Sequence, residues 1–280
     1  MDGVVTGEPI GIVVQARMLS SRLPGKTLRP LGGVSLLERL LRRMRMSTAA
    51  AGLVVATGDR PENRTIVARC AELGVTCHVG AEDNCLQRMV EAARVSGFGS
   101  FVRITADNPL IDPSGIDLAI RQYRAEGLDY LDNICYGGYP HGAGCEIVSE
   151  RALSFSEQQW RMPENLEHVT WALRRHIGLF KHGFFQAPPE LHRPAYRFSV
   201  DREEDFQAVQ GIYAHFNWRD DITLAEIVAC LDARPDLVDL NAQADERLLL
   251  HSQLMAWQLE TTAAEAQAWR RFRRNGGAVA

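Results

Sequence analysis

This 280-residue chain lacks the sequence features of membrane-spanning, secreted and nucleic-acid-coating proteins. No uninterrupted apolar stretch reaches the length that crosses a bilayer. The first residues, MDGVVTGEP, have neither the basic start nor the apolar middle of a secretory signal. Lys and Arg number 31 against 35 Asp and Glu, a net charge of −4, so there is no general basic field. We therefore expect a cytoplasmic protein with no nucleic-acid or membrane partner.

Paired cysteines are missing as well. The six cysteines are scattered, without a CxxC pair or a histidine at zinc-binding spacing, and are interpreted as reduced thiols. Hydrophobic residues make up 46% and charged residues 24%, which are ordinary values for a globular protein. They exclude a disordered chain, a collagen-like fibre and a small disulfide scaffold. The length predicts about two domains, or one large α/β domain with an attached piece.

Strand and helix signals alternate in the first half of the chain. Short β-branched runs, apolar on both faces, predict strands at residues 11–15, 52–57, 75–79 and 100–105. Helical periodicity is found at residues 35–46, 62–73, 83–95 and from Pro113 onward. Repeated strand–helix–strand units predict an α/β fold, a doubly wound, mostly parallel Rossmann-like sheet. Its ligand is expected beyond the carboxyl ends of the strands.

The pattern changes after about Tyr130. Residues 133–146, rich in Gly, Tyr and His, predict a loop with short flanking strands. Further helices are expected at residues 150–159, 163–176 and 201–216, and extended segments at 180–189 and 195–200. We expect a nucleotide-binding half at 1–132, a smaller substrate and dimer region at 133–197, and a return to the catalytic domain at 198–240. A C-terminal helical extension is expected at 241–280.

The last predicted helix, about 242–274, has a loose apolar stripe and a basic end. The stripe consists of Leu248, Leu249, Met255, Leu259 and Trp269. It favours a packing or dimerisation helix, and the alternative is a basic tail for a membrane or nucleic acid.

The segment VVQARMLSSRLPGKTL, residues 13–28, carries the strongest chemical signal. A buried strand ends at Gln15 and leads into a loop of cations, hydroxyls and a glycine: Arg17, Ser20, Ser21, Arg22, Gly25 and Lys26. Arg donor forks, a Lys point charge and free backbone N–H groups suit a polyphosphate. The loop is neither a Walker A motif, because Ser20 stands where its first glycine belongs, nor GxGxxG. On composition alone, a solvated basic loop is an equal alternative.

The pattern QARxxSSRLPGKxL closely resembles the nucleotide-binding loop of the sugar-acid cytidylyltransferases, which activate acylneuraminate and 3-deoxy-manno-octulosonate with CTP. The most similar branch is the spore-coat polysaccharide cytidylyltransferase-like one. The resemblance continues through VVATGDRPEN, RITADNPLIDP, YPHGAGCEIVS, EHVT and FSVDREEDF, over about residues 10–213. It implies the nucleotidyltransferase form of the Rossmann-like fold and a Mg²⁺-dependent transfer of CMP from CTP, with release of pyrophosphate.

The resemblance also assigns expected roles to the loop and its neighbours. Arg17, Arg22 and Lys26 would hold the triphosphate and act as the catalytic cations, with loop contacts from Ser20, Ser21 and Gly25. The base would face Ala16 and the turn from Thr57 to Asp59. Thr105 stands where relatives often have a different polar side chain that contacts the nucleotide.

Asp107, in TADNP, and Asp201, in SVDREEDF, are the metal ligands that the resemblance implies. Carboxylate oxygens suit Mg²⁺. From the residues alone, the more frequent role of Asp107 is a turn former before Asn-Pro, and that of Asp201 is the N-cap of the next helix, which is compatible with binding a metal.

The acceptor site is expected to include His141, Gly144, Glu146, His168 and Arg197. Family members tend to read P-x-G-L-D-V-E here, so Gly144 replaces an acidic residue and disfavours a polyol. Nearby cations modestly favour a strongly anionic acceptor, either a phosphonate of the phosphonoformate type or a sugar acid. Taken singly, each histidine or arginine of this region is more often a surface or core residue than a ligand-binding one. A homodimer is expected from the family.

Two other functions remain open at this point. A glycosyltransferase of similar architecture would usually carry a D-x-D-like pair, which PDLVDL at 235–240 does not supply at a strand end. A non-catalytic nucleotide-binding protein is the other alternative, and the intact Arg17, Lys26, Asp107 and Asp201 argue against it.

Overall fold

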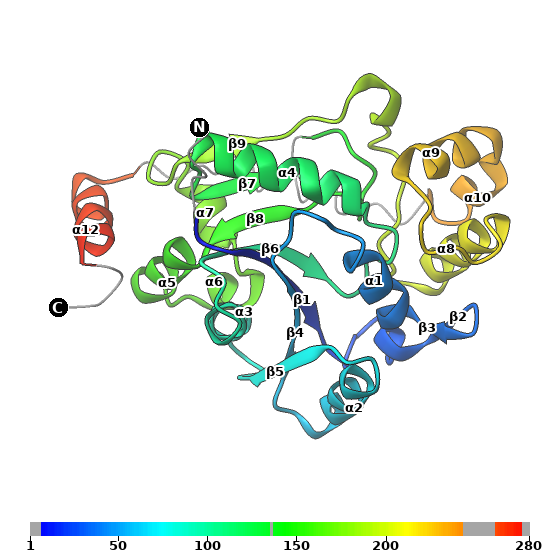
Figure 1. The fold of residues 1–280 in the computed structure, drawn as a ribbon, viewed down its shortest axis with the longest axis horizontal. Helices are drawn as coiled ribbons and strands as arrows, with labels where there is room; N and C mark the ends of the chain where they lie inside the picture. The colour runs from blue at the N-terminus through cyan, green and yellow to red at the C-terminus, as the bar shows by residue number, and fades with distance from the viewer. Residues whose placement is uncertain (1–6, 135–136, 243–260, 276–280) are drawn as a thin grey trace, which may run out of the picture.

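A computed structural model describes residues 7–134, 137–242 and 261–275 of the chain. A seven-stranded sheet runs through the molecule in the order β5-β4-β1-β6-β8-β7-β9 (Figure 1). The strands are β1 (Ile10–Ala16), β4 (Leu53–Gly58), β5 (Thr76–Gly80), β6 (Ser100–Thr105), β7 (Tyr130–Asp132), β8 (Glu146–Ser149) and β9 (His182–Phe184). Strand β8 is antiparallel to β6 and β7, and the other pairings are parallel. The predicted doubly wound, mostly parallel sheet is confirmed.

Helices cover both faces of the sheet because successive strand residues point to opposite sides. One face packs against α1 (Leu36–Met44), α2 (Arg64–Glu72) and α4 (Pro113–Glu126). The other face packs against α3 (Cys85–Val95), α5 (Glu150–Gln159) and α7 (Trp171–Arg175). In β1, Ile12 and Val14 belong to the first core and Val13 to the second.

A third apolar core lies beside the sheet and joins the end of the chain to the first loop. It contains α8 (Glu203–His215), α9 (Leu224–Ala233) and α10 (Pro235–Asp239). Two leucines pack into the same core: Leu31, in the hairpin of β2 (Pro30–Leu31) and β3 (Val34–Ser35), and Leu36, which directly follows it. This core places the residues before α8 against the loop after β1.

The helix predicted at 163–176 is wrong as a single element. It is divided into α6 (Pro163–His168) and α7, because Val169 has φ +57° and interrupts the helical backbone. The break orients the hydroxyl of Thr170 toward Glu146, to which it donates at 2.8 Å. Residues 195–200 form no strand, although Arg197 makes an isolated bridge with His141.

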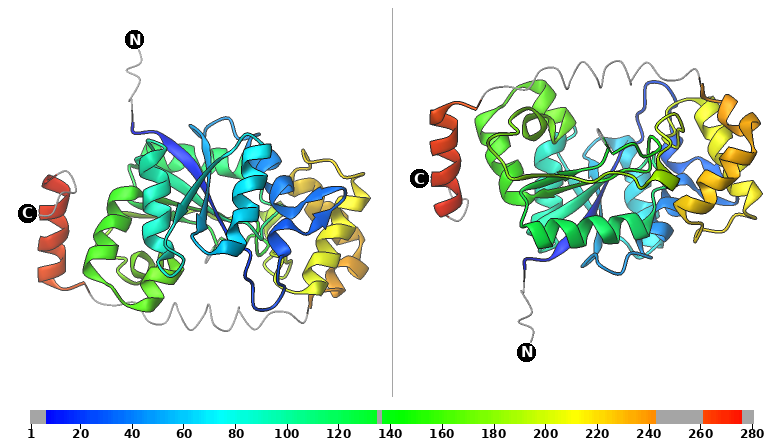
Figure 2. Two further views of the ribbon diagram at one scale, coloured as in Figure 1. Left: turned by 90° about the horizontal axis from the view of Figure 1, so that it is seen from below. Right: turned by 90° about the horizontal axis from the view of Figure 1, so that it is seen from above.

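At the C-terminus, α12 (Ala263–Arg274) lies at the end of the molecule opposite α8–α10 (Figure 2). Its buried Trp269 and Phe272 pack against Phe155 of α5 and near Phe180. The predicted stripe residues 248, 249, 255 and 259 lie outside the described residues. None of the helices in the described ranges combines the length and the hydropathy that a bilayer-crossing helix needs.

Candidate active site

The loop after β1 is held in a compact shape by its own backbone. The hydroxyl of Thr27 donates to the carbonyl of Arg17 at 2.7 Å, and the N–H of Gly25 donates to the carbonyl of Met18 at 3.1 Å. Gly25 has φ +73°, a conformation that costs glycine little, and it precedes the short 3₁₀ helix η1 (Lys26–Leu28). This turn directs Lys26 inward, and Lys26 is only 8% exposed.

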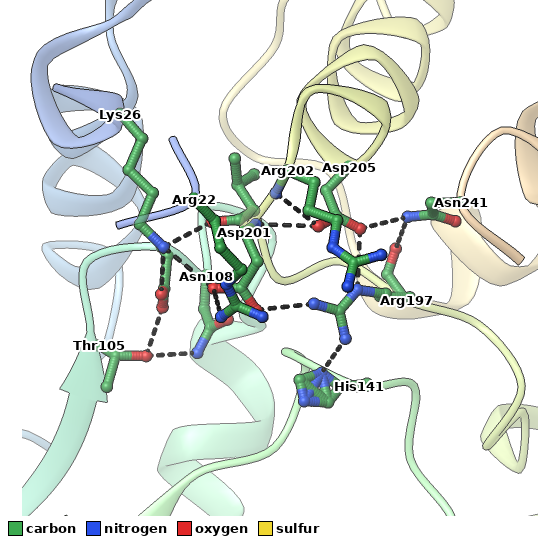
Figure 3. Close-up of polar contacts among 12 residues, drawn as sticks. Arg22, Lys26, Thr105, Asn108, His141, Arg197, Asp201, Arg202, Asp205 and Asn241 are labelled. Atoms are coloured by element: carbon green, nitrogen blue, oxygen red, sulfur yellow. Dashed lines mark hydrogen bonds and ion pairs between the residues drawn. The ribbon is translucent and has the colours of Figure 1, made fainter. Parts of the chain in front are cut away.

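Lys26 lies at the centre of the site and joins the two predicted metal ligands (Figure 3). Its ammonium donates to Asp107 Oδ2 at 2.8 Å, Asp201 Oδ1 at 3.2 Å and the carbonyl of Val200 at 2.7 Å. Arg22 Nη2 also contacts Asp201 Oδ1, at 2.8 Å. Two carboxylates from distant parts of the chain therefore converge on one point occupied by a cation.

A buried network fixes the orientation of Asp201. Arg197 binds Asp201 Oδ2 at 2.7 Å and Asp205 Oδ1 at 2.8 Å. The other oxygen of Asp205 accepts the backbone N–H groups of Asp201 and Arg202, each at 2.9 Å. Asn241 Nδ2 donates to Asp205 Oδ1 at 3.1 Å. The helix begins at Glu203, so Asp201 precedes the N-cap Arg202, and its carboxylate faces the loop of Lys26.

A cavity of about 180 Å³ opens between the loop and these carboxylates. Its lining includes the predicted cations, hydroxyls and carboxylates: Arg17, Ser20, Ser21, Arg22, Lys26, Thr105, Asp107 and Asp201. Gln15, Thr27 and Ala106 complete the lining. Thr105 donates to Asp107 Oδ1 at 2.6 Å and accepts from Asn108 at 2.8 Å, which orients the carboxylate. Eight separately predicted residues thus share one cavity at the carboxyl edge of the sheet.

The residues predicted to face the base are not part of the lining of this cavity. Ala16 and Thr57 are buried partners in the β1–β4 pairing, and Asp59 accepts the N–H of Glu82 at 3.2 Å. The neighbouring Arg60 and Glu82 line a second, larger cleft of about 690 Å³. Gln15, Arg17 and Thr105 line both cavities, so the two adjoin.

Of the five predicted acceptor residues, His141 and Arg197 lie together, but the five do not share one site. His168 ends α6 and lines the larger cleft, whereas His141 Nδ1 lies 3.5 Å from Arg197 Nη1 beside Asp201. Gly144 is buried, and a Cβ there would lie 2.8 Å from Asn133 Oδ1. The carboxylate of Glu146 is entirely buried.

Glu146 anchors a charged cluster beneath the larger cleft. It accepts from Arg103 Nη1 at 2.7 Å, Arg174 Nη2 at 2.7 Å, Thr170 Oγ1 at 2.8 Å and the hydroxyl of Tyr130. Burial raises the pKa of this carboxyl, but the charges of Arg174 and Arg103 and the hydrogen bonds outweigh it and lower the pKa to about 2. Glu146 is therefore ionised and acts through the side chains that it holds.

Sequence reasoning missed three side chains around the larger cleft. Arg88 and Arg103 line it, and Asn63 ties together the loops that border it. Arg103 had a detectable signal, because Arg103 and Thr105 are two residues apart on β6 and so share one side of the strand, just before Asp107. No sequence pattern pointed to Asn63 or Arg88, because their contacts join segments that are separated in the sequence.

The chain is similar to known cytidylyltransferases. A family model described as "Cytidylyltransferase" matches residues 11–218. The spore coat polysaccharide biosynthesis protein SpsF of Bacillus subtilis is 33% identical over 229 residues, covering 80% of this chain and 94% of SpsF. A 3-deoxy-manno-octulosonate cytidylyltransferase of Chlorobium limicola is 33% identical over 184 residues, covering 60% of this chain and 71% of the relative.

A solved cytidylyltransferase structure from Leptospira borgpetersenii has a TM-score of 0.77 and 26% identity, covering 83% of this chain and 97% of that one. The matched residues contain the loop of Lys26, Asp107 and Asp201, and a CTP-dependent nucleotidyltransferase accounts for their convergence. These similarities exclude the glycosyltransferase alternative, and the chain belongs to the cytidylyltransferase family.

Proposed function

We propose that the protein transfers CMP from CTP to a small anionic acceptor, a phosphonate or a sugar acid, in a Mg²⁺-dependent reaction that releases pyrophosphate. The observation that carries this proposal is the convergence of Asp107 and Asp201 on one cation beside a cavity lined by Arg17 and Arg22. The reaction needs that combination, because the triphosphate requires cations and a magnesium ion requires carboxylate oxygens.

The donor set fits magnesium. Asp107 Oδ2 and Asp201 Oδ1 already share one ammonium at 2.8 and 3.2 Å, so both can reach a single ion. Within the described residues no group of three or more His, Cys, Asp or Glu side chains could hold a metal. Two carboxylates, with phosphate oxygens and water in the other positions, are the usual protein share of a Mg²⁺ site. Bound Mg²⁺ would supply neutralisation of the phosphate charge.

The side chains of this protein account for the remaining chemistry by positioning and charge. An acceptor oxygen attacks the α-phosphorus of CTP, the bond from that phosphorus to the bridging oxygen breaks, and pyrophosphate leaves. Arg17 and Arg22 bind the phosphates and stabilise the charge that develops on the leaving group. Lys26 adds its positive charge at the same carboxyl edge of the sheet. Ser20 and Ser21 donate hydrogen bonds from the loop.

Residues 133–197 are proposed to carry the acceptor and dimer contacts. Phe184 of the edge strand β9 is 44% exposed and Ile134 is 38% exposed, which supports an apolar surface for a second copy of the chain. The described cysteines are unbridged, which supports a reducing, cytoplasmic setting.

Pyrophosphate release tests the proposal. The protein is incubated with CTP, Mg²⁺ and, in turn, sugar acids such as 3-deoxy-manno-octulosonate, sugar phosphates and small phosphonates such as phosphonoformate. Release with a sugar acid or a phosphonate, lost when EDTA is added, is the expected result and identifies the acceptor class. Binding of CTP, seen as a raised melting temperature, with no release from any acceptor would contradict the transferase assignment.

A further inference from the structure

The larger cleft contains more arginines than a nucleoside requires. Four arginines line it, together with Glu82, Asp83 and Glu167. Arg60 is paired with Glu82 at 3.8 Å and Asp83 at 3.5 Å, and Arg103 is paired with Glu146, which is not part of the lining. Arg17 also lines the smaller cavity, so Arg88 and Arg103 are the arginines left for a further ligand. Cytosine and ribose are uncharged, and the smaller cavity around Lys26 already provides cations for the triphosphate. The remaining arginines therefore indicate a second anionic group.

Arg103 is the arginine best placed to bind that group. It lies on β6 two residues before Thr105, so the two side chains share one side of the strand, and Thr105 donates to Asp107 in the turn that follows β6. Its side chain is 14% exposed. Nη1 donates to Glu146 and Nη2 donates to Gln15 Oε1 at 3.0 Å, while the enclosed Nε has no partner among the described residues.

A guanidinium has five N–H donors, and those two hydrogen bonds use two of them. The remaining donors of a planar fork match the paired oxygens of a carboxylate, phosphonate or phosphate. A lysine would supply the charge without that geometry. The contacts from Glu146 and Gln15 hold the fork in one orientation, so little side-chain entropy is lost when an anion binds.

We propose that Arg103 binds the anionic group of the acceptor, a carboxylate or a phosphorus oxyanion, and that Glu146 is the positioning residue that aims its guanidinium into the cleft. This inference rests on the proposed CMP transfer and specifies which residue selects the acceptor. Glu146 does not touch the acceptor. It is buried beneath the cleft and acts through Arg103.

Binding measurements test this without turnover. The wild-type protein is first loaded with Mg²⁺ and α,β-methylene-CTP, a non-transferable analogue, and its affinity is measured by calorimetry. The loaded protein is then titrated with three probe anions: methylphosphonate, inorganic phosphate and 3-deoxy-manno-octulosonate. The same titrations are made with Arg103→Lys, Arg103→Met and Glu146→Gln, and with Arg121→Met as a control, because Arg121 is exposed on α4.

At least one probe is expected to bind the loaded wild-type protein, and Arg103→Met should weaken it by roughly tenfold or more, since one charge-assisted contact is lost. Arg103→Lys should recover only part of the loss. Glu146→Gln should raise the probe Kd while the analogue Kd changes less than about twofold. A role of Glu146 in stability alone would instead lower the melting temperature and affect both ligands equally.

Probe affinity that survives Arg103→Lys and Arg103→Met unchanged would overturn the inference, and so would a loaded wild-type protein that binds none of the three anions. Either result leaves the proposed function standing if the analogue binds. Failure of the wild-type protein to bind the analogue would instead contradict the proposed function itself.

Discussion

At the scale of single residues, the ammonium of Lys26 contacts two carboxylates and a backbone carbonyl at once. Lys26→Met removes this charge with little change in side-chain volume. We expect turnover to fall by about 10²- to 10³-fold, because one well-aimed charge contributes roughly 3–4 kcal/mol to transition-state stabilisation. The measurement is pyrophosphate release at saturating CTP.

The control for this variant is Lys181→Met, which changes the other lysine of the chain, an exposed residue beside β9. Turnover of the control should match the wild type. Near-normal turnover by Lys26→Met would mean that the ammonium has no part in the reaction.

Glu146 and Arg197 are both held by other side chains of the protein. Both were expected to contact the acceptor, yet Glu146 is buried under Arg103 and Arg174, and Arg197 is paired with Asp201 and Asp205. A charged residue near a glycine-rich loop looks the same in a sequence whether it faces a ligand or another side chain. Only the group that the charged residue contacts in the folded protein distinguishes the two roles.

At the scale of elements, Asn63 joins three loops at the carboxyl edge of the sheet. Its Oδ1 accepts the N–H of Met18 at 2.9 Å, and its Nδ2 donates to the carbonyl of Gly58 at 3.1 Å and to Glu82 Oε2 at 2.8 Å. Met18 follows β1, Gly58 is the last residue of β4, and Glu82 follows β5. Asn63 thus holds the phosphate loop against the rim of the larger cleft.

Asn63→Ala should raise the KM for CTP by about tenfold and lower the free energy of unfolding by about 1–3 kcal/mol, because buried polar groups lose their partners. Steady-state kinetics and urea unfolding measure the two effects. Asn63→Asp should not rescue binding, since it places a carboxylate beside Glu82. The control is Gln122→Ala, which changes an amide on the surface of α4. An equal change in KM and stability in this control would contradict the role of Asn63 in joining the loops.

At the scale of the whole molecule, a buried histidine links stability to pH. His182 of β9 packs among Tyr130, Phe180 and Phe184. Burial lowers its pKa from 6.5 to about 4. The unfolded chain therefore takes up a proton near pH 6.5 that the folded protein takes up only near pH 4. This contribution to stability is complete above pH 6.5 and is lost as the pH falls toward 4.

Between pH 7.5 and 5, His182 should account for a loss of about 2 kcal/mol in the free energy of unfolding. Urea unfolding at the two pH values measures it. His182→Phe should reduce the pH dependence by that amount, whereas changing the exposed His215 to Gln should leave it intact. A dependence unchanged in His182→Phe would show that other groups cause it.

Much of the architecture follows from local patterns. The apolar runs predicted as strands at 11–15, 52–57, 75–79 and 100–105 correspond to β1, β4, β5 and β6, with ends shifted by at most one residue. The helix at 163–176 was wrong because tertiary contacts, which bring Thr170 to Glu146, favour a break that the local sequence does not signal. Strand and helix patterns in the sequence indicate which side chains are buried. In a sheet covered by helices, the buried side chains are those that hold the elements together, so these patterns predict the elements.

The type of fold and the chemistry of the loop after β1 follow from the amino-acid sequence, because strand periodicity, the turn at Gly25 and the charges of the loop are local properties. Which side chains meet depends on the tertiary structure. Lys26 and Asp201 are 175 residues apart, and Asn63 and Met18 are 45 apart. Such contacts depend on how the three apolar cores pack, and no local signal encodes their distances.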